Sequence, residues 1–387
     1  METVRFGVVG LGNMGSFHCG YMDNLEGAKL AAICDKDPAK LDGVGSKYSV
    51  PRFAKFEEMI GSGAIDAVLV ATPHYSHPEM AIAALDKGLH VLVEKPEAVT
   101  VNEARRMNEV AAKHPKQKYG IMFQMRTNPV NRKIRDVVMN GDVGEISRIT
   151  WIVTNWFRTW TYYASGGWRA TWAGEGGGVL LNQCPHNLDL LFWLTGLMPN
   201  RITAVASIGK THPIEVEDEV SAIMEYPNGA IGHFVTTTGE APGTDRLEIV
   251  GDRGRLVSEG GKILLKLNRK STKLVRETST ESFANPEAWD IDVPINRSQP
   301  EGHRYVTQNF VNAILKDEPM LAPGVEGIKG LEIGNATMMS GLTRKAVDLP
   351  LDGNAFDAFL KEMTQKYGGK KSLAAKTADV NMTASFK

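Results

Sequence analysis

The sequence predicts an α/β protein: a doubly wound parallel sheet comes first, followed by an α+β domain with a large, mostly antiparallel open sheet. Two observations support this prediction. In roughly the first third of the chain, short apolar runs alternate with helical stretches, which is typical of a parallel sheet covered on both faces. Further on, strand-like runs follow one another with turn sequences between them. A chain of 387 residues has room for two such domains.

In the first part, predicted strands and helices alternate. Residues 4–9 form an apolar run, a glycine-rich turn follows, and a helix is expected over 16–25. Asp37 is a suitable N-cap for a second helix, because Pro38 stands at its first position. The other predicted strands are 29–34, 67–71, 89–93 and 118–122, and the other predicted helices are 78–87 and 102–113.

The second part is predicted to be rich in strands. Helices are expected over 130–139, 182–194 and 303–315, and strands over 202–208, 216–226, 231–238, 246–250, 254–258 and 262–267. We therefore divide the chain into a first domain (1–124), a second domain (125–367) and a polar tail or arm (368–387).

Charge and cysteine content narrow the range of partners. The formal net charge is -1, so there is no overall positive field to attract nucleic acid or an anionic membrane. Cys19, Cys34 and Cys184 form no CxxC pair, which fits a reducing compartment. Neither a membrane-length apolar run nor a secretory signal is apparent. We expect a cytoplasmic protein with a small-molecule partner.

The glycines that follow the first strand predict a dinucleotide site. Gly10 permits a tight turn, Gly12 lets the backbone approach a pyrophosphate, and Gly15 lets helix and strand pack closely. Asp35 ends the second strand, where an acid accepts hydrogen bonds from ribose hydroxyls and repels a 2'-phosphate. NAD is therefore expected, although the neighbouring Lys36 leaves NADP possible. The alternative is a glycine turn in an α/β domain that binds no nucleotide.

Two further segments end strands of the same sheet, at the edge where open α/β sheets bind ligands. Lys95, within Glu94-Lys95-Pro96, can bind a substrate hydroxyl or polarise a carbonyl; the alternative is an ion pair with Glu94. The expected cofactor-binding residues are Gly10, Gly12, Asn13, Met14, Gly15, Asp35, Lys36, Ala71, Thr72, Pro73, His74, His77, Glu94 and Lys95.

His74 and His77 stand three residues apart and could in principle ligate a metal ion. No third ligand lies near them in the sequence, and nicotinamide chemistry requires no metal. We therefore expect no metal site.

In the second part, a glycine-rich stretch leads into a predicted helix that starts near Asn182. On such a helix Asn182, His186 and Asp189 lie on one face. His186 is a candidate general acid/base, because an imidazole titrates near neutral pH. Asp189 is expected to support or pack the helix, and Cys184 to be a buried small residue.

Aromatic residues and arginines cluster over residues 155–172. Flat apolar faces beside hydrogen-bond donors suit a pyranose ring, and the alternative is a core or subunit interface. The expected substrate-binding residues are Lys95, Arg158, Tyr163, Trp168, Arg169, Asn182 and His186.

Together these features resemble the glucose/fructose oxidoreductase, inositol dehydrogenase and rhizopine-catabolism (Gfo/Idh/MocA) family over residues 4–350. The likeness consists of the Val-Val-Gly-Leu-Gly-Asn-Met-Gly opening, Ala71-Thr72-Pro73, Glu94-Lys95-Pro96, and the glycine-rich lead into the helix with His186. The resemblance implies a Rossmann domain followed by a domain whose open sheet mediates homo-oligomers, either dimers or tetramers. It also implies that Lys95 is the catalytic lysine and His186 the substrate acid/base.

One position departs from the family pattern. Many members have aspartate four residues before the histidine, where this chain has Asn182. An amide can still bond to a substrate hydroxyl, but it cannot raise the pKa of the histidine as a carboxylate would.

The resulting hypothesis is an NAD(P)-dependent dehydrogenase that oxidises a secondary alcohol of a sugar, glycoside or cyclitol. Two alternatives stay open. One is a lyase or glycosidase that uses bound NAD transiently, through oxidation, elimination and reduction. The other is a non-catalytic sensor that binds a dinucleotide.

Overall fold

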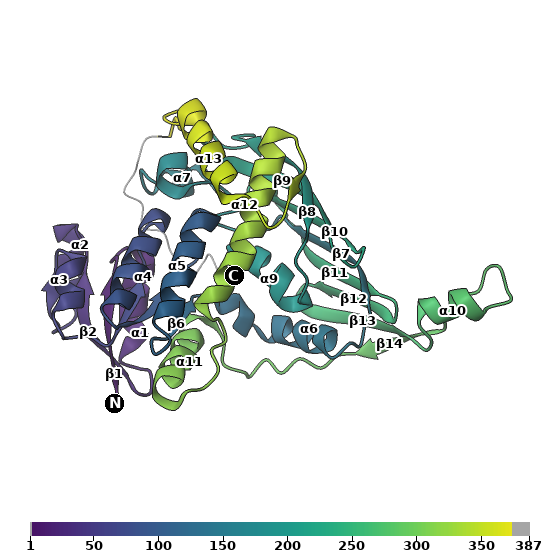
Figure 1. Ribbon diagram of the computed structural model, residues 1–387, viewed down its shortest axis with the longest axis horizontal. Coiled ribbons are helices and arrows are strands. Elements are labelled where there is room, and N and C mark those ends of the chain that lie inside the picture. Colours follow the sequence, from purple (N-terminus) through teal and green to yellow (C-terminus); the bar gives the residue numbers. More distant parts are fainter. Residues whose placement is uncertain (1, 374–387) are drawn as a thin grey trace.

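The computed structural model describes residues 2–373 and contains two sheets with helices packed around them (Figure 1). The first sheet has the strand order β3-β2-β1-β4-β5-β6, and all of its pairs are parallel. Its strands are β1 (Val4–Val9), β2 (Ala28–Cys34), β3 (Arg52–Phe53), β4 (Ala67–Val70), β5 (His90–Val93) and β6 (Tyr119–Ile121).

The strand order reverses between β1 and β4, and open α/β sheets bind ligands outside the carboxyl ends of the strands at such a reversal. Every residue of β4 is buried, as a strand covered on both faces requires. The helices connecting these strands are α1 (Asn13–Met22), α2 (Pro38–Gly45), α3 (Phe56–Gly61), η1 (His74–Ser76), α4 (His77–Asp86) and α5 (Val101–Lys113). The Asp37 side chain caps α2 as predicted, accepting from the Ala39 N–H at 3.0 Å.

The second sheet has nine strands in the order β14-β13-β12-β11-β7-β10-β9-β8-β15. All pairs are antiparallel except β7 with β10. Its strands are β7 (Ile146–Val153), β8 (Arg201–Ile208), β9 (Glu217–Glu225), β10 (Ile231–Thr237), β11 (Asp245–Gly251), β12 (Gly254–Glu259), β13 (Lys262–Asn268), β14 (Ala288–Asp292) and β15 (Val347–Asp348). The predicted fold class is thereby confirmed.

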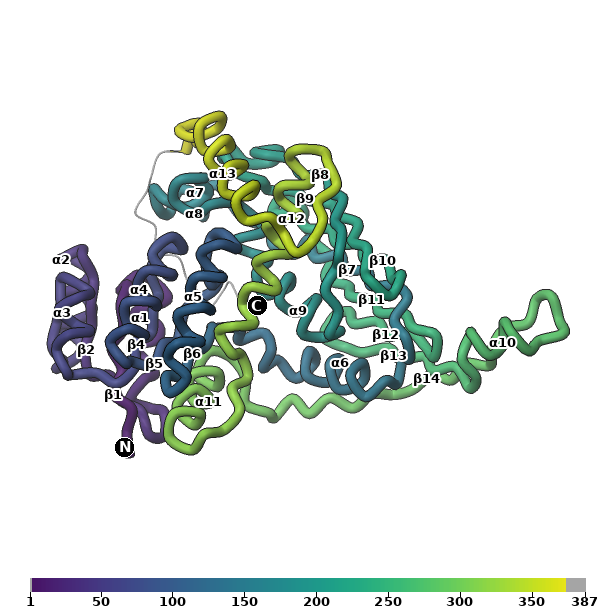
Figure 2. Tube along the Cα trace, viewed as in Figure 1, coloured from purple at the N-terminus to yellow at the C-terminus, as the bar shows by residue number. Residues whose placement is uncertain are grey.

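Helices cover one face of the second sheet (Figure 1). Val205, Ile223, Ile231 and Leu264 are exposed on its other face. Between β13 and β14 the chain projects away from the rest of the molecule (Figure 2). The remaining helices are η2 (Gln124–Thr127), α6 (Pro129–Met139), α7 (Trp160–Ala164), α8 (Trp172–Glu175), α9 (Pro185–Thr195), α10 (Thr272–Thr278), α11 (Gly302–Lys316), η3 (Gly324–Glu326), α12 (Gly327–Thr343) and α13 (Gly353–Tyr367).

One late helix returns to the first sheet. α11 lies within residues 125–367, yet it packs against β1 and β5, and the ring centroids of Phe310 and Phe6 are 6.3 Å apart. The segment assigned to the second domain thus contributes to the core of the first. Most of the predicted tail or arm (368–387) lies outside the described residues. Within residues 2–373, no helix has both the length and the apolar character needed to span a membrane.

Candidate active site

The three glycines after β1 meet three different surroundings. Gly10 has φ +87°, and a Cβ there would lie 2.6 Å from the Ala71 carbonyl oxygen. A Cβ on Gly15 would lie 1.7 Å from the Gly10 carbonyl oxygen, so the helix can approach the loop only without a side chain. At Gly12 the same atom would meet nothing within 4 Å. Gly10 and Gly15 are required by the fold, whereas Gly12 leaves space beside the backbone.

Gly12 also precedes the N-terminus of α1. The helix starts at Asn13 and Met14, no side chain caps it, and its first turn contains no acidic residue. The free N–H groups and the helix dipole therefore favour an anion at this end. A pyrophosphate fits the space beside Gly12.

Asp35 stands at the end of β2, next to this loop. Its Oδ2 accepts from the Leu11 N–H at 2.7 Å and its Oδ1 from the Asp37 N–H at 2.9 Å. Each oxygen keeps lone-pair capacity for a ribose hydroxyl. The carboxylate is partly exposed and Lys36 is exposed. These residues fit the adenosine ribose of a dinucleotide.

The segment after β4 is tied to other loops by two histidines. His77 is buried between two carbonyl oxygens, those of Thr72 and Pro96, at 2.8 Å each. Nδ1 of His74 lies 3.2 Å from the Glu175 carbonyl oxygen. Both histidines thus have protein partners, which connect this segment to the carbonyls of Pro96 and Glu175. Ala71, Thr72 and Pro73 follow the strand end directly.

Glu94 has a partner other than Lys95. Its Oε1 lies 2.7 Å from Nε2 of His18, and both side chains are buried. Burial by itself raises the pKa of Glu94, but the hydrogen bond and charge of His18, together with His303 and Lys95, lower it to about 2. The structure therefore does not favour a simple Glu94–Lys95 ion pair. Sequence reasoning missed His18, whose only signal was its place on the first helix, three residues after Gly15.

The Lys95 side chain reaches across to the second domain. Its Nζ donates to the backbone carbonyl of Asn182 at 2.9 Å. Burial lowers the pKa of Lys95; Glu94 and Glu175 oppose this shift, and Arg169 and Arg158 add to it. The ammonium is thus held by a carbonyl and surrounded by charges of both signs.

His186 lies in the first turn of α9 and is 6% exposed. Neither of its ring nitrogens has a hydrogen-bond partner among the described residues. Burial, Lys95 and His303 lower the pKa of His186 well below its usual value, and Glu94 opposes the shift. The imidazole is therefore neutral at physiological pH, with both nitrogens available to a ligand.

The expectation that Asn182, His186 and Asp189 share one helix face is wrong. α9 starts only at Pro185, which lacks an N–H and suits the first position, so Asn182 lies in the preceding turn. Asp189 instead forms a buried ion pair with Arg126: the Nη2–Oδ1 distance is 2.5 Å, and each side chain is 1% exposed. This pair joins α9 to η2.

Asn182 is held by groups from other parts of the site. Its Oδ1 accepts from the Tyr162 hydroxyl at 3.2 Å, and its Nδ2 donates to Oε1 of Glu175. The second oxygen of Glu175 accepts from the Ala170 N–H at 2.6 Å. Burial raises the pKa of Glu175, and Arg169, the hydrogen bonds from Ala170 and Asn182, and Lys95 oppose that rise.

Glu175 is thus a buried carboxylate that sequence reasoning missed. An aspartate at position 182 would face Glu175 with like charge, whereas the amide donates a hydrogen bond to it. Asn182 and Glu175 therefore form a matched pair.

Cys184 is a buried small residue, as predicted. Its Sγ lies 3.0 Å from Oγ1 of Thr236, and burial raises the pKa of its thiol to about 12.

The aromatic and arginine segment gathers around Tyr162. The guanidinium carbons of Arg158 and Arg169 lie 5.2 Å and 4.5 Å from the centroid of its ring. Arg169 also lies 4.8 Å from the ring of Trp168. Tyr163, the predicted substrate contact, is instead buried and donates to Oγ1 of Thr238 at 2.9 Å. Of the two tyrosines, Tyr162 is the one that contacts the other site residues.

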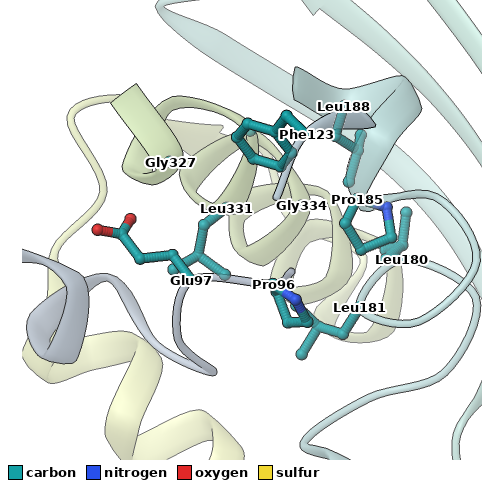
Figure 3. A pocket seen from close by; sticks show the side chains of 11 residues that line it. Pro96, Glu97, Phe123, Leu180, Leu181, Pro185, Leu188, Gly327, Leu331 and Gly334 are labelled. Atoms are coloured by element: carbon teal, nitrogen blue, oxygen red, sulfur yellow. The ribbon is translucent and has the colours of Figure 1, made fainter. Parts of the chain in front are cut away.

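A small cavity lies behind the Lys95 loop, with the Glu97 side chain beside Gly327 and Leu331 (Figure 3). Its volume of about 10 Å³ is near the minimum for a single water molecule, which makes it too small for a sugar. Oε1 of Glu97 accepts from the Tyr119 hydroxyl at 2.5 Å, and Oε2 has no partner among residues 2–373. Burial raises the pKa of Glu97 to about 8. No group of three or more His, Cys, Asp or Glu within the same described residues could hold a metal ion.

Comparison with known proteins identifies both parts of the chain. Residues 4–122 match a family model described as an oxidoreductase family with an NAD-binding Rossmann fold. Residues 131–257 match the model of the GFO/IDH/MocA C-terminal domain.

Individual relatives extend this likeness over most of the chain. The inositol 2-dehydrogenase of Rhizobium meliloti is 22% identical over 351 residues, which is 90% of this chain and 99% of the relative. A glycosyl hydrolase family 109 protein of Shewanella pealeana is 28% identical over 197 residues, covering 46% of this chain and 42% of that protein. Among solved structures, the WlbA dehydrogenase of Bordetella pertussis, in complex with NADH and UDP-GlcNAcA, is similar with a TM-score of 0.75. It is 26% identical, and the match covers 90% of this chain and 100% of that one.

Proposed function

Because the chain belongs to the GFO/IDH/MocA family of NAD-binding oxidoreductases, we propose that it transfers a hydride between nicotinamide and a secondary alcohol carbon of a sugar, glycoside or cyclitol. The observation that supports this most directly is the approach of Lys95 to the segment that leads into His186. Its Nζ donates to the carbonyl of Asn182 at 2.9 Å, four residues before His186, and its charge lowers the pKa of the imidazole. The histidine offers two buried nitrogens with no partner among the described residues.

In the oxidative direction, His186 accepts the hydroxyl proton of the substrate, and the Lys95 ammonium donates a hydrogen bond to the same oxygen. The neutral imidazole is the form that can accept a proton. The ammonium stabilises the negative charge that develops on the oxygen as the proton leaves. Bound NAD supplies the acceptor for the hydride that leaves the carbinol carbon as the carbonyl forms.

We propose NAD rather than NADP as the preferred cofactor. Asp35 stands where the adenosine ribose is expected, and its carboxylate would repel a 2'-phosphate. Lys36 is exposed and could partly offset that repulsion.

The substrate class is proposed from the site and from the names of relatives. The ring of Tyr162 lies under the guanidinium groups of Arg158 and Arg169, and its hydroxyl donates to Asn182, whose carbonyl accepts from Lys95. Aromatic and hydrogen-bonding groups together suit a sugar or cyclitol. One relative is named inositol 2-dehydrogenase, and one similar structure holds a sugar nucleotide with NADH.

We also propose a homo-oligomer in a reducing, cytoplasmic setting. The exposed apolar residues on the open face of the second sheet support assembly. Cys19, Cys34 and Cys184 are free and buried, which supports a reducing compartment.

The replacement Lys95→Met tests the mechanism. It keeps a long apolar stem and removes the ammonium, so turnover should fall by about 10³-fold. NAD affinity, measured by fluorescence titration, should change little, because the glycine loop and Asp35 are untouched. Lys118→Met is the control, since Lys118 pairs with Asp317 at the surface. Turnover retained by the Lys95 variant would remove the lysine from the mechanism.

A second candidate function is a glycosidase or lyase that oxidises and re-reduces its substrate with bound NAD. The match to a glycosyl hydrolase family 109 protein favours it, although less than half of each chain is covered. Absorbance at the nicotinamide band separates the two functions. A dehydrogenase accumulates NADH in proportion to product, whereas the transient cycle releases product with no net NADH. Binding without either product indicates a sensor.

A further inference from the structure

Arg158 is a partly buried cation without a counter-ion among residues 2–373. No carboxylate lies within 4.0 Å of its guanidinium in that part of the chain, and its Nη1 donates only to the Phe157 carbonyl at 3.0 Å. Its Nε is buried and has no hydrogen-bond partner there. By contrast, Arg126 pairs with Asp189, and Arg169 lies 3.9 Å from Glu175. A buried N–H without an acceptor is costly, so the Nε of Arg158 requires an explanation.

Two other unsatisfied groups nearby are also donors, while Gln183, whose Nε2 donates to the Tyr162 hydroxyl, has a buried Oε1 acceptor without a partner among the described residues. The indole Nε1 of Trp156 and the Nε of Arg169 are buried without partners among the described residues. The Arg158 guanidinium carbon lies 5.5 Å from the Trp156 ring and 5.2 Å from the Tyr162 ring. A carboxylate has only acceptor sites, up to four of them, and binds guanidinium groups in a bidentate manner. The donors around Tyr162 therefore match an anion better than a neutral hydroxyl.

The charges near Lys95 point the same way. Lys95, Arg158 and Arg169 contribute three positive charges, and two carboxylates, Glu94 and Glu175, act on Lys95. Glu94 also hydrogen-bonds to His18, and the three cations still outnumber the two carboxylates by one. A neutral sugar would leave this excess of positive charge unbalanced, whereas an anionic ligand would reduce it.

Arg158 is held firmly, as a recognition residue must be. Its N–H donates to the Thr238 carbonyl at 2.9 Å, and its own carbonyl lies 2.9 Å from Nε2 of His212. His212 is in turn fixed by Asp218, with Nδ1 3.1 Å from Oδ2. Hydrogen bonds to its N–H and to its carbonyl therefore fix the backbone of Arg158 before any ligand binds.

A short series of contacts connects Arg158 to the reacting groups. The Arg158 guanidinium lies over Tyr162, the Tyr162 hydroxyl donates to the side chain of Asn182, and the carbonyl of Asn182 accepts from Lys95. Lys95 and Arg158 are thus linked through two residues, Tyr162 and Asn182.

We propose that the substrate is a sugar acid, an aldonate or uronate type of molecule, whose carboxylate binds Arg158 while its reacting hydroxyl lies at Lys95 and His186. This rests on the function proposed above and narrows its substrate class. Arg158 is then the specificity-determining residue, and Arg169 contributes a second positive charge to the same region.

The test compares matched ligand pairs with the NAD-bound protein by calorimetric titration. Each pair is a sugar acid and its methyl ester, which has nearly the same size and hydroxyls but no charge; glucuronate, galacturonate and gluconate cover the main stereochemistries. The wild-type protein should bind at least one acid ten times more tightly than its ester, and Arg158→Gln should reduce that preference to about one. Arg158→Lys should restore part of it, because the charge returns without the bidentate geometry.

Arg269→Gln is the matched control, because Arg269 also stacks on an aromatic ring, 4.0 Å from Trp289, but in the projecting hairpin. It should leave the preference unchanged. Equal binding of acids and esters by the wild-type protein, absence of acid binding across the panel, or an unchanged preference in Arg158→Gln would each overturn the proposal.

NADH formation is recorded in the same samples to separate this inference from the proposed function. If NADH forms from neutral sugars and acids alike, hydride transfer stands and the acid preference fails. If acids bind through Arg158 but no NADH forms, the carboxylate site stands and the dehydrogenase function fails.

Discussion

The cofactor side and the substrate side of the site are built in different ways. On the cofactor side, the backbone sets the geometry: Gly10 and Gly15 permit close approach, and Asp35 fixes the loop through the Leu11 N–H. On the substrate side, side chains hold segments together: Lys95 donates to the backbone carbonyl of Asn182, 87 residues later in the chain, and the side chain of Asn182 donates to Glu175. The first arrangement tolerates little change in its own residues, whereas the second depends on partners remaining matched.

This difference explains how much of the site the sequence revealed. The glycine loop and Asp35 lie within a stretch of about 25 residues, so spacing alone connects them. Lys95 and His186 emerged as candidates because each stands at a recognisable local position. Glu175 and His18, which bond to Asn182 and Glu94, did not, because a glutamate in a glycine-rich segment and a histidine on a helix have no local signature of burial.

The prediction of the fold from the sequence is limited in the same way. The first sheet was predictable because each of its strands, apart from the two-residue β3, is a short apolar run between helices, whereas α12 was missed. That helix contains four glycines, including Gly330 and Gly334, and glycine disfavours helices. A Cβ on Gly330 would lie 2.7 Å from the Asp189 nitrogen, so this glycine permits close packing on α9. Tertiary burial, which a single sequence does not display, stabilises α12 against its composition.

The largest expected effect tests the cofactor side, where one methyl group is added at each of two glycines. Gly15→Ala places a carbon where the Gly10 carbonyl already lies, so the free energy of unfolding should fall by about 3 kcal/mol. Gly12→Ala meets no protein atom, and φ at Gly12 is -67°, so stability should stay within about 0.5 kcal/mol. Its NAD affinity should fall at least tenfold, because the methyl group occupies the space left for the pyrophosphate.

Urea denaturation and NAD titration of the two variants measure these effects. If Gly12→Ala unfolds as readily as Gly15→Ala, the space beside Gly12 belongs to the fold rather than to a ligand. Unchanged NAD affinity in Gly12→Ala would place the pyrophosphate elsewhere.

A charge swap tests whether the substrate side depends on matched partners. In Asn182→Asp two carboxylates face each other, so one must keep a proton near neutral pH, and its pKa is raised. We expect kcat/KM to fall about tenfold. The double replacement Asn182→Asp with Glu175→Gln restores a single carboxylate beside an amide, and kcat/KM should recover to within about threefold of the wild type.

The pH dependence of activity in the double variant tests more than structure, because it would not change if residues 175 and 182 served only to hold the fold. Its carboxylate stands four residues before His186, where negative charge raises the pKa of the imidazole. The base must be neutral to accept a proton, so activity is lost as the pH falls through this pKa. The acid limb of the double variant should therefore lie at higher pH than that of the wild type. An Asn182→Asp variant with full activity would show that the two residues are not coupled.

The smallest expected effect is a change in the preference for NAD over NADP when Asp35, on the cofactor side, is replaced. Asp35→Ser removes the charge that would repel a 2'-phosphate and keeps a small hydrogen-bonding group. The ratio of NAD to NADP affinity should fall about tenfold, which corresponds to 1.4 kcal/mol. The ratio is the proper measure, because Asp35 also accepts from the Leu11 and Asp37 N–H groups and its loss loosens the loop for both cofactors. Lys36→Ser is the matched control and should move the ratio the other way, since it removes a cation that would tolerate the phosphate. If Asp35→Ser weakens both cofactors equally, the carboxylate acts only on the loop, and the preference for NAD must come from residues beyond it.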